Sequence, residues 1–187
     1  MSIFSRFLPP ITSLEHAFTG HYELRGEIED ADCVIGFSFG FRGKTYTAPG
    51  LSNEDLAEVA LDHYDSLPKI FQFEIADAYV AAGGDGKEVI RIEKHRVPGK
   101  YLDTYEVAVQ AKAIMERRGY ARPVLLAHPY HMPRVEAVCT HLGINWIADG
   151  NERGAIEFDP QSSQKWTRSI DKWRGYEPLA MLFYRLK

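Results

Sequence analysis

Cysteine is scarce in this sequence, and its scarcity excludes two kinds of small structured protein. Among 187 residues there are two cysteines, Cys33 and Cys139, each inside an apolar stretch. Two distant cysteines cannot form a disulfide framework, and they lack the spacing of a cysteine zinc site. We therefore predict that both thiols are buried in a hydrophobic core.

Long hydrophobic runs and clusters of basic residues are also missing. The formal net charge is −4, and no segment concentrates lysine and arginine, so nucleic acid is not an expected partner. No window reaches the roughly 20 apolar residues of a membrane span. Residues 1–10 lack the apolar core of a signal peptide. We therefore expect a cytoplasmic protein without a membrane span, and its oligomeric state stays open.

The sequence does contain a regular alternation of strand-like and helix-like segments. Strands are predicted at residues 32–39, 70–82, 89–93, 123–127 and 144–148. Helices are predicted at residues 13–18, 52–67, 104–118 and 133–142, and a last one from Pro178, with Ser52 as the cap of the second helix. This alternation predicts an α/β three-layer sandwich with a Rossmann-like, mostly parallel sheet. Residues 1–30 are predicted to be an N-terminal arm, and residues 31–187 a single α/β domain.

A parallel sheet also predicts where a ligand binds. In open α/β sheets, ligands sit beyond the carboxyl ends of the strands, where the strand order reverses. Three loops follow predicted strands in this way, at residues 38–50, 93–103 and 128–133. Within the first loop, Ser38 and Gly40 are candidate ligand contacts, because glycine lets a ligand approach the backbone closely.

The densest group of polar residues lies in the last of these loops, between a predicted strand and a helix. His128, Tyr130, His131 and Arg134 occur within seven positions, and Pro133 suits the first turn of the helix. A helix start offers free N–H groups, and arginine can bind a phosphate or carboxylate with two hydrogen bonds. His131 is a candidate for proton transfer. The group predicts a site for a small anion, although its side chains could also simply pack the loop.

Two sharper interpretations of these loops have weak support. His128 and His131 suggest a metal, but no third ligand stands nearby at a zinc spacing, so no metal site is predicted. Residues 36–40 have the Gly-x-Ser-x-Gly spacing of a nucleophile elbow, but they lie in a Phe-rich buried strand. Neither a G-x-G-x-x-G nor a Walker A pattern occurs, so a standard dinucleotide or P-loop site is not supported.

The start of the helix at residue 104 has two interpretations that can both hold. Asp103 and Glu106 match a capping box, in which the Glu106 side chain reaches back to the cap amide. Alternatively, Thr104 and Glu106 line the ligand site, and Glu106 binds a diol or acts as a base. Glu93, at the end of the preceding strand, is a further candidate carboxylate.

The helix start at residue 104 and the loop that contains Tyr130 to Arg134 together resemble the YdcF/SanA/ElyC-like family of bacterial proteins. This family is classified as domain of unknown function 218. The resemblance rests on Asp103-Thr104-Tyr105-Glu106 and on Tyr130-His131-Met132-Pro133-Arg134, in this order, within a region from Asp32 to Ala148. It implies a Rossmann-like sheet with a cleft between these loops. It also implies that Glu93, Thr104, Glu106, His131 and Arg134 are the polar residues of the site.

The chain departs from that family at three places, and we expect it to lack the membrane anchor of many relatives. Val107 stands where Asn is usual, Ala127-His128 replaces a common Thr-Ser pair, and residues 76–79 lack a Ser-Gly-Gly ending. The resemblance implies binding of a small anionic or nucleotide-like ligand, S-adenosylmethionine being one candidate cofactor. The alternative is a hydrolase or transferase that acts on a phosphorylated or sugar-bearing substrate in cell-envelope metabolism, with His131 and Glu106 as catalytic residues. A scaffold without a ligand is disfavoured, because it needs no convergent His, Arg and Glu.

Overall fold

Four parallel strands form the centre of the molecule. The computed structural model describes residues 11–184, so the segment compared with a signal peptide lies outside the described residues. The strands are β1 (Cys33–Phe37), β2 (Lys69–Gln72), β3 (Val89–Ile92) and β4 (Pro123–Ala127). Their order is β3-β2-β1-β4, and every neighbouring pair is parallel. The order therefore reverses beside β1, and the crevice expected of such a sheet lies at the carboxyl ends of β1 and β4.

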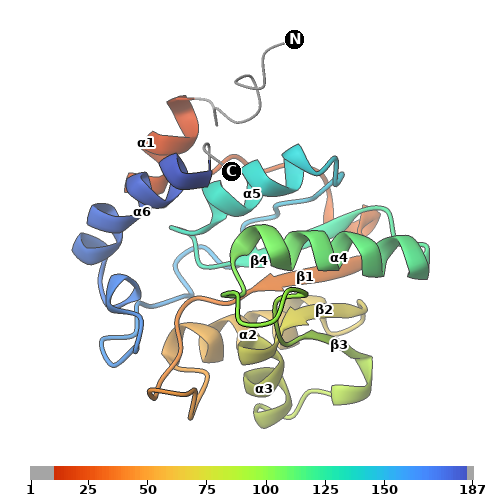
Figure 1. Ribbon diagram of the computed structural model, residues 1–187. Helices are drawn as coiled ribbons and strands as arrows, with labels where there is room; N and C mark the ends of the chain where they lie inside the picture. Colours follow the sequence, from red (N-terminus) through yellow and green to blue (C-terminus); the bar gives the residue numbers. More distant parts are fainter. Residues whose placement is uncertain (1–10, 185–187) are drawn as a thin grey trace.

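Helices cover both faces of this sheet (Figure 1). One face carries α2 (Leu51–Tyr64) and α3 (Phe73–Ala81), and the other carries α4 (Thr104–Arg118) and α5 (Met132–His141). Two further helices, α1 (Ile11–Thr19) and α6 (Ile170–Tyr184), pack against each other at one side of the sandwich. Short 3-10 turns occur at Ile28–Asp30, Gly86–Glu88 and Lys165–Thr167. The predicted three-layer α/β architecture is confirmed.

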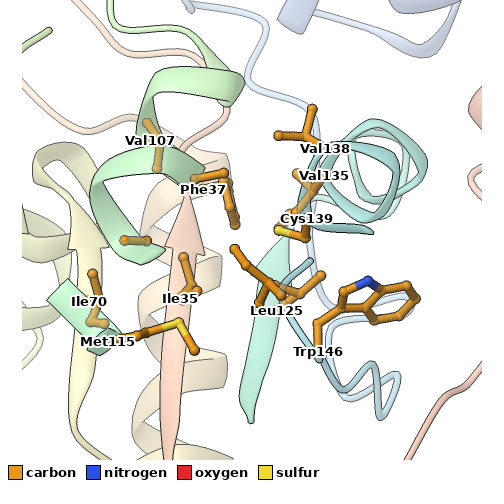
Figure 2. Packing of buried hydrophobic residues seen from close by; sticks show 14 of the residues in the cluster. Ile35, Phe37, Ile70, Val107, Met115, Leu125, Val135, Val138, Cys139 and Trp146 are labelled. Carbon is orange, nitrogen blue, oxygen red and sulfur yellow. The ribbon is translucent and has the colours of Figure 1, made fainter. Parts of the chain in front are cut away.

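Alternate residues of the strands form two hydrophobic cores. Ile35 and Phe37 of β1 pack with α4 and α5, whereas Val34, the residue before Ile35, faces α2 and α3. Figure 2 shows the first core, to which β4 contributes Leu125 and α5 contributes Cys139. Such alternation follows from the two-residue period of a strand, and a central parallel strand buries both of its faces. Cys33 and Cys139 are free and buried, as predicted.

The segment from α4 to β4 matches the prediction residue for residue. The carboxylate of Asp103 accepts a hydrogen bond from the Glu106 amide (2.9 Å), which caps the first turn of α4. At the other end, Gly119 has φ +76°, the left-handed conformation that terminates a helix. Local signals at both ends agreed with the tertiary structure here, so the boundaries were predictable.

Two predicted strands are wrong. Only the first residues of the segment 70–82 form a strand, and α3 begins at Phe73. Ile75, Ala76 and Tyr79 face the core at helical spacing, a pattern that the continuous apolar run concealed. Residues 144–148 form isolated bridges rather than a strand: Ile147 pairs with Val124.

Two helix starts also differ from the prediction. Ser52 lies inside α2 and donates its hydroxyl to the Glu157 carbonyl (2.6 Å) instead of capping the helix, which begins at Leu51 and ends at Tyr64. The last helix begins at Ile170, so Pro178 lies in its interior. Proline removes one backbone hydrogen bond there, which made it look like a helix start in the sequence.

None of the helices within residues 11–184 has the length and apolar character needed to span a bilayer.

Candidate functional site

A cavity of about 360 Å³ opens at the carboxyl ends of the strands. Residues that follow all four strands line it: Ser38 after β1, Gln72 at the end of β2, Thr104 after β3 and His131 after β4. Helix α6 supplies Trp173 to the opposite wall. Its volume is within the range of small-molecule sites, and its position is the one that the strand order dictates.

The loop after β1 is held in place by buried polar contacts. Asn53 of α2 accepts from the Phe39 amide (2.9 Å) and donates to the Gly40 carbonyl (2.8 Å). Gly40 has φ +80°, and a Cβ there would lie 2.5 Å from the hydroxyls of Ser162 and Thr167. Only glycine fits this position, so the loop presents Ser38 and its own backbone to the cavity.

This geometry does not form a nucleophile elbow. The chain after Ser38 runs through a loop to residue 50 instead of entering a helix directly, and the Phe39 amide that would stabilise an oxyanion is bonded to Asn53. Gly36 serves packing, since a Cβ there would lie 2.7 Å from the Phe71 ring.

Thr104 and His131 join the two helices on one face of the sheet. The Thr104 hydroxyl and His131 Nε2 lie 3.0 Å apart, at the starts of α4 and α5. The loops that hold them leave β3 and β4, which are the two edge strands of the sheet and are not neighbours. The loops meet because α4 crosses back over the sheet and packs against α5.

His131 is buried in a way that keeps it uncharged. Burial lowers its pKa well below the usual value, and the positive charge of Arg134 lowers it further. Its Nδ1 is buried with no hydrogen-bond partner among the described residues. His131 is therefore a neutral hydrogen-bonding group at physiological pH.

Arg134 provides the positive charge of the cavity, from the first turn of α5. Its Nε lies 3.0 Å from Glu177 Oε1 of α6, and its guanidinium lies 5.5 Å from the centre of the Trp173 ring. Glu177 is fully buried. Burial raises the pKa of Glu177 to about 7, although Arg134 opposes the shift. The pair is consequently not a fixed double charge at neutral pH.

Aromatic side chains make up most of the wall opposite the sheet. Trp166 and Tyr176 stack at 4.7 Å with an interplanar angle of 14°, and both line the cavity. Trp173 donates its indole N–H to the Tyr130 carbonyl (3.0 Å), which fixes its ring. Tyr101 is held by an amide hydrogen from Gln164 (2.9 Å). Such a wall offers flat apolar surfaces beside one cation.

A second acidic residue, Glu74, lies behind the cavity. It is in the first turn of α3, and the side chains of Ser38 and Gln72, both in the cavity wall, lie near its carboxylate and favour its charged form. Burial raises the pKa of Glu74 to about 7, and its Oε2 has no hydrogen-bond partner among the described residues. Such a group can exchange a proton near neutral pH.

Glu106 lies outside the cavity lining. Its carboxylate accepts from the Arg96 side chain (2.7 and 3.1 Å), from the Arg96 amide (3.0 Å) and from Gln110 (2.9 Å). Burial by itself raises its pKa, but these hydrogen bonds outweigh burial and the pKa falls to about 2. The expected back-bond to the cap amide is replaced by these contacts. Glu93 also lies elsewhere, 3.4 Å from Arg91 at the exposed edge strand.

His128 and Tyr130 face a second, more open cavity of about 610 Å³. The His128 ring stacks on Phe39 (4.0 Å, 16°), so these two rings form a wall between the two cavities. Burial lowers the pKa of His128 to about 3, and its Nδ1 accepts from the Tyr130 amide (3.2 Å). Because His128 and His131 line different cavities, they do not form a joint metal site.

The structure thus brings together five of the residues predicted for the site: Ser38, Gly40, Thr104, His131 and Arg134. The sequence reasoning missed Gln72, Glu74, Trp173 and Glu177. The first two were hidden in a segment interpreted as one long strand, and the available signal was that these two polar residues, on either side of Phe73, interrupt the apolar run after residues 70 and 71. Glu177 precedes Pro178, so it fell outside the predicted last helix.

Comparison of the chain with protein-family models, with curated proteins and with solved structures gives no significant match in any of the three.

Proposed function

We propose that the cavity binds a small ligand that combines a planar ring with an anionic group, as nucleotide-like molecules do. One observation carries this proposal. Arg134 is the single arginine or lysine among the described residues that line the cavity, and it lies between the buried Glu177 and the Trp173 ring. A cation set into an aromatic wall favours an anion attached to a flat ring.

The pairing of Arg134 with Glu177 supports anion binding rather than opposing it. Because the pKa of Glu177 is raised to about 7, a large fraction of its carboxyl groups is protonated at neutral pH. The arginine charge is then available to a second anion, at the expense of one proton taken up by Glu177. A permanently ionised partner would compete with the ligand.

Aromatic and hydrogen-bonding side chains of the cavity are both placed to contact the ring of the ligand. The stacked pair of Trp166 and Tyr176 gives one flat apolar surface, and Tyr101 adds another aromatic side chain at the rim. Thr104, Gln72 and Gln164 provide hydrogen-bonding groups around them. S-adenosylmethionine, whose adenine and carboxylate suit these two features, stays among the candidates.

The predicted relationship with the YdcF/SanA/ElyC-like family remains a proposal. Thr104, His131 and Arg134 of its motifs line the cavity, whereas Glu93 and Glu106 do not. A YdcF-like site in this chain would therefore have to work without Glu93 and Glu106. Asp103 of the same motif segment lines the cavity, and Glu74 and Glu177 lie next to residues of its lining.

Glu74 favours a second candidate function, a hydrolase or transferase acting on a phosphorylated or sugar-bearing substrate. Its carboxyl, with a pKa of about 7 and with Ser38 and Gln72 against it, is suited to move a proton to or from a ligand in the cavity. It would take the role that was predicted for Glu106 and His131.

The test is a calorimetric titration with adenosine, adenosine monophosphate, S-adenosylmethionine and inorganic phosphate in turn. We expect a ligand with both ring and anion to bind, and Arg134→Lys to weaken binding about tenfold or more, because lysine lacks the planar fork. Arg96→Lys is the matched control, since Arg96 pairs with a glutamate outside the cavity lining. Equal affinity of the Arg134→Lys variant and the wild type would refute the proposal.

The enzyme candidate needs its own measurement. Each ligand that binds is incubated with wild type and with Glu74→Gln, and its turnover is followed by NMR. Loss of turnover with retained binding in the variant would support proton transfer by Glu74. Absence of turnover in the wild type for every bound ligand would leave binding as the function.

A further inference from the structure

Two histidines and a glutamate come together where α1 ends. His16 lies in the last turn of α1, and His21 and Glu23 follow the helix. In the part of the chain that the structure describes, one ligand atom from each of these three residues lies within 4.8 Å of the other two. His21 Nε2 and Glu23 Oε1 are 3.7 Å apart, and the rings of His16 and His21 are 5.2 Å apart.

The turn that brings them together is fixed by local contacts. Gly20, with φ +68°, donates its amide to the His16 carbonyl (2.8 Å) and reverses the chain at the end of α1. The His21 amide is held by the Thr19 hydroxyl (3.3 Å). A Cβ at Gly20 would lie 2.8 Å from the Tyr130 ring, so the turn packs tightly against the loop after β4.

This turn also docks on the body of the protein. Helix α1 packs against α5 and α6 (Figure 1), and Tyr22, between His21 and Glu23, is fully buried. The Tyr22 hydroxyl donates to Glu152 (2.5 Å). The backbone that carries the three side chains is therefore held in place before any ion arrives, and this lowers the entropy cost of binding one.

We infer that His16, His21 and Glu23 form a binding site for a divalent transition-metal ion, with Zn²⁺ as the ion that fits best. Two imidazoles and one carboxylate are a typical three-residue set of a zinc site that keeps a further position open. Imidazole ligands favour zinc, copper or nickel over magnesium and calcium, which need oxygen ligands. The side chains of His21 and Glu23 are mostly exposed, so an ion has free access.

The open position would lie at the rim of the second cavity. His21 lines this cavity together with Tyr130, His128 and Arg153. A small anionic ligand could therefore occupy the cavity and complete the coordination of the ion. This site is separate from the proposed ring-and-anion cavity, because the stacked rings of Phe39 and His128 stand between the two.

The experiment is a titration of tag-free protein with Zn²⁺ against a chromophoric chelator, repeated with Co²⁺ and recorded as a visible absorption spectrum. We expect one equivalent of Zn²⁺ to bind, and Co²⁺ to give the intense bands of a four-coordinate site. His16→Ala and His21→Ala should each weaken binding at least tenfold. Glu23→Gln should weaken it less, and because the Glu23 side chain is 81% exposed, this variant tests the site without a risk to folding.

His63→Ala is the matched control, because His63 is an exposed histidine near the end of α2. It should bind Zn²⁺ as the wild type does. The inference is overturned if the wild type binds no stoichiometric Zn²⁺, or if the His16 and His21 variants bind it as tightly as the His63 control.

Discussion

Two arginine–glutamate pairs in this molecule behave in opposite ways. Arg96 and Glu106 lie 2.7 Å apart near the surface, where the arginine side chain is 60% exposed. Arg134 and Glu177 lie 3.0 Å apart in the interior, where the glutamate is fully buried. The pKa of Glu106 falls to about 2, whereas the pKa of Glu177 rises to about 7. The same two residue types therefore give a fixed ion pair in one place and a proton-exchanging pair in the other.

The number of hydrogen bonds explains this difference better than the distance between the charges. Glu106 accepts four hydrogen bonds, one of them from a backbone amide, so its charged form is well stabilised. Neither carboxylate oxygen of Glu177 accepts a hydrogen bond from the described residues. A buried carboxylate without such donors is costly to ionise even beside an arginine. An ion pair that exchanges a proton is the better candidate for a functional site.

The largest expected difference between the pairs concerns the loss of the arginine. Arg134→Leu should lower the free energy of unfolding by about 3 to 5 kcal/mol at pH 8, because Glu177 loses the cation that lowers its pKa and the folded state must then keep it protonated at a pH at which the unfolded state releases the proton. Arg96→Leu should cost about 1 kcal/mol or less, since Arg96 is exposed and its backbone amide still binds Glu106. Urea unfolding of both variants measures these free energies. Equal losses in the two variants would show that burial does not make the Arg134–Glu177 pair more costly to break than the Arg96–Glu106 pair.

The pH dependence of stability should have opposite signs for the two glutamates. Because the pKa of Glu177 is raised, the folded state holds a proton that the unfolded state has released. Its contribution is therefore present below pH 4.5 and lost as pH rises towards 7. Glu106, with a lowered pKa, contributes above pH 4.5, and that contribution is lost as pH falls towards 2.

Replacing each glutamate by glutamine, which cannot ionise, tests these opposite pH dependences of stability. Relative to the wild type, Glu177→Gln should become more stable as pH rises from 4.5 to 7, by up to about 3 kcal/mol. Glu106→Gln should lose about 2 kcal/mol at pH 7 and nothing near pH 2, with unchanged ligand affinity. Denaturant melts from pH 2 to 8 test both. Parallel pH profiles for the two variants would contradict the comparison.

The smallest effect on stability is expected from removal of the hydrogen bond between Thr104 and His131. This bond links α4, which carries Glu106, to α5, which carries Arg134. Thr104→Val removes the hydroxyl 3.0 Å from His131 and should cost about 1 kcal/mol of stability. Thr140→Val is the control, because Thr140 accepts from the Trp146 indole at an exposed position and should cost less. If the Thr104 variant is as stable as the wild type, His131 is positioned by packing alone.

The sequence predicted those parts of the fold in which local signals agree with the tertiary structure. Helix α4 has a capping aspartate at one end and Gly119 at the other, and both were sufficient to give its bounds. The carboxyl-end loops were also predictable, because parallel strands fix where such loops meet. Arg134, His131 and Thr104 reach the cavity for that reason.

The remaining part of the site depends on contacts between distant segments. The boundary between β2 and α3 lies inside one apolar run, so Glu74 could not be assigned to a helix start. Glu177 and Trp173 meet Arg134 only because α6 folds back across the strand ends. Glu106 looked available from its spacing alone, but its partner Arg96 comes from a loop ten residues earlier.

Two of the three tryptophans of the chain belong to the cavity wall, and this gives the protein a built-in optical reporter. Trp166 and Trp173 emit from positions that a bound ring would cover. Trp146 lies outside the cavity lining, next to Ile147, whose amide donates to the Pro123 carbonyl at the start of β4, and under the guanidinium of Arg25 (4.3 Å). When the tryptophan fluorescence of the unmodified protein is excited, the emission of Trp166 and Trp173 should therefore change as the cavity is occupied. The emission of Trp146 serves as an internal reference.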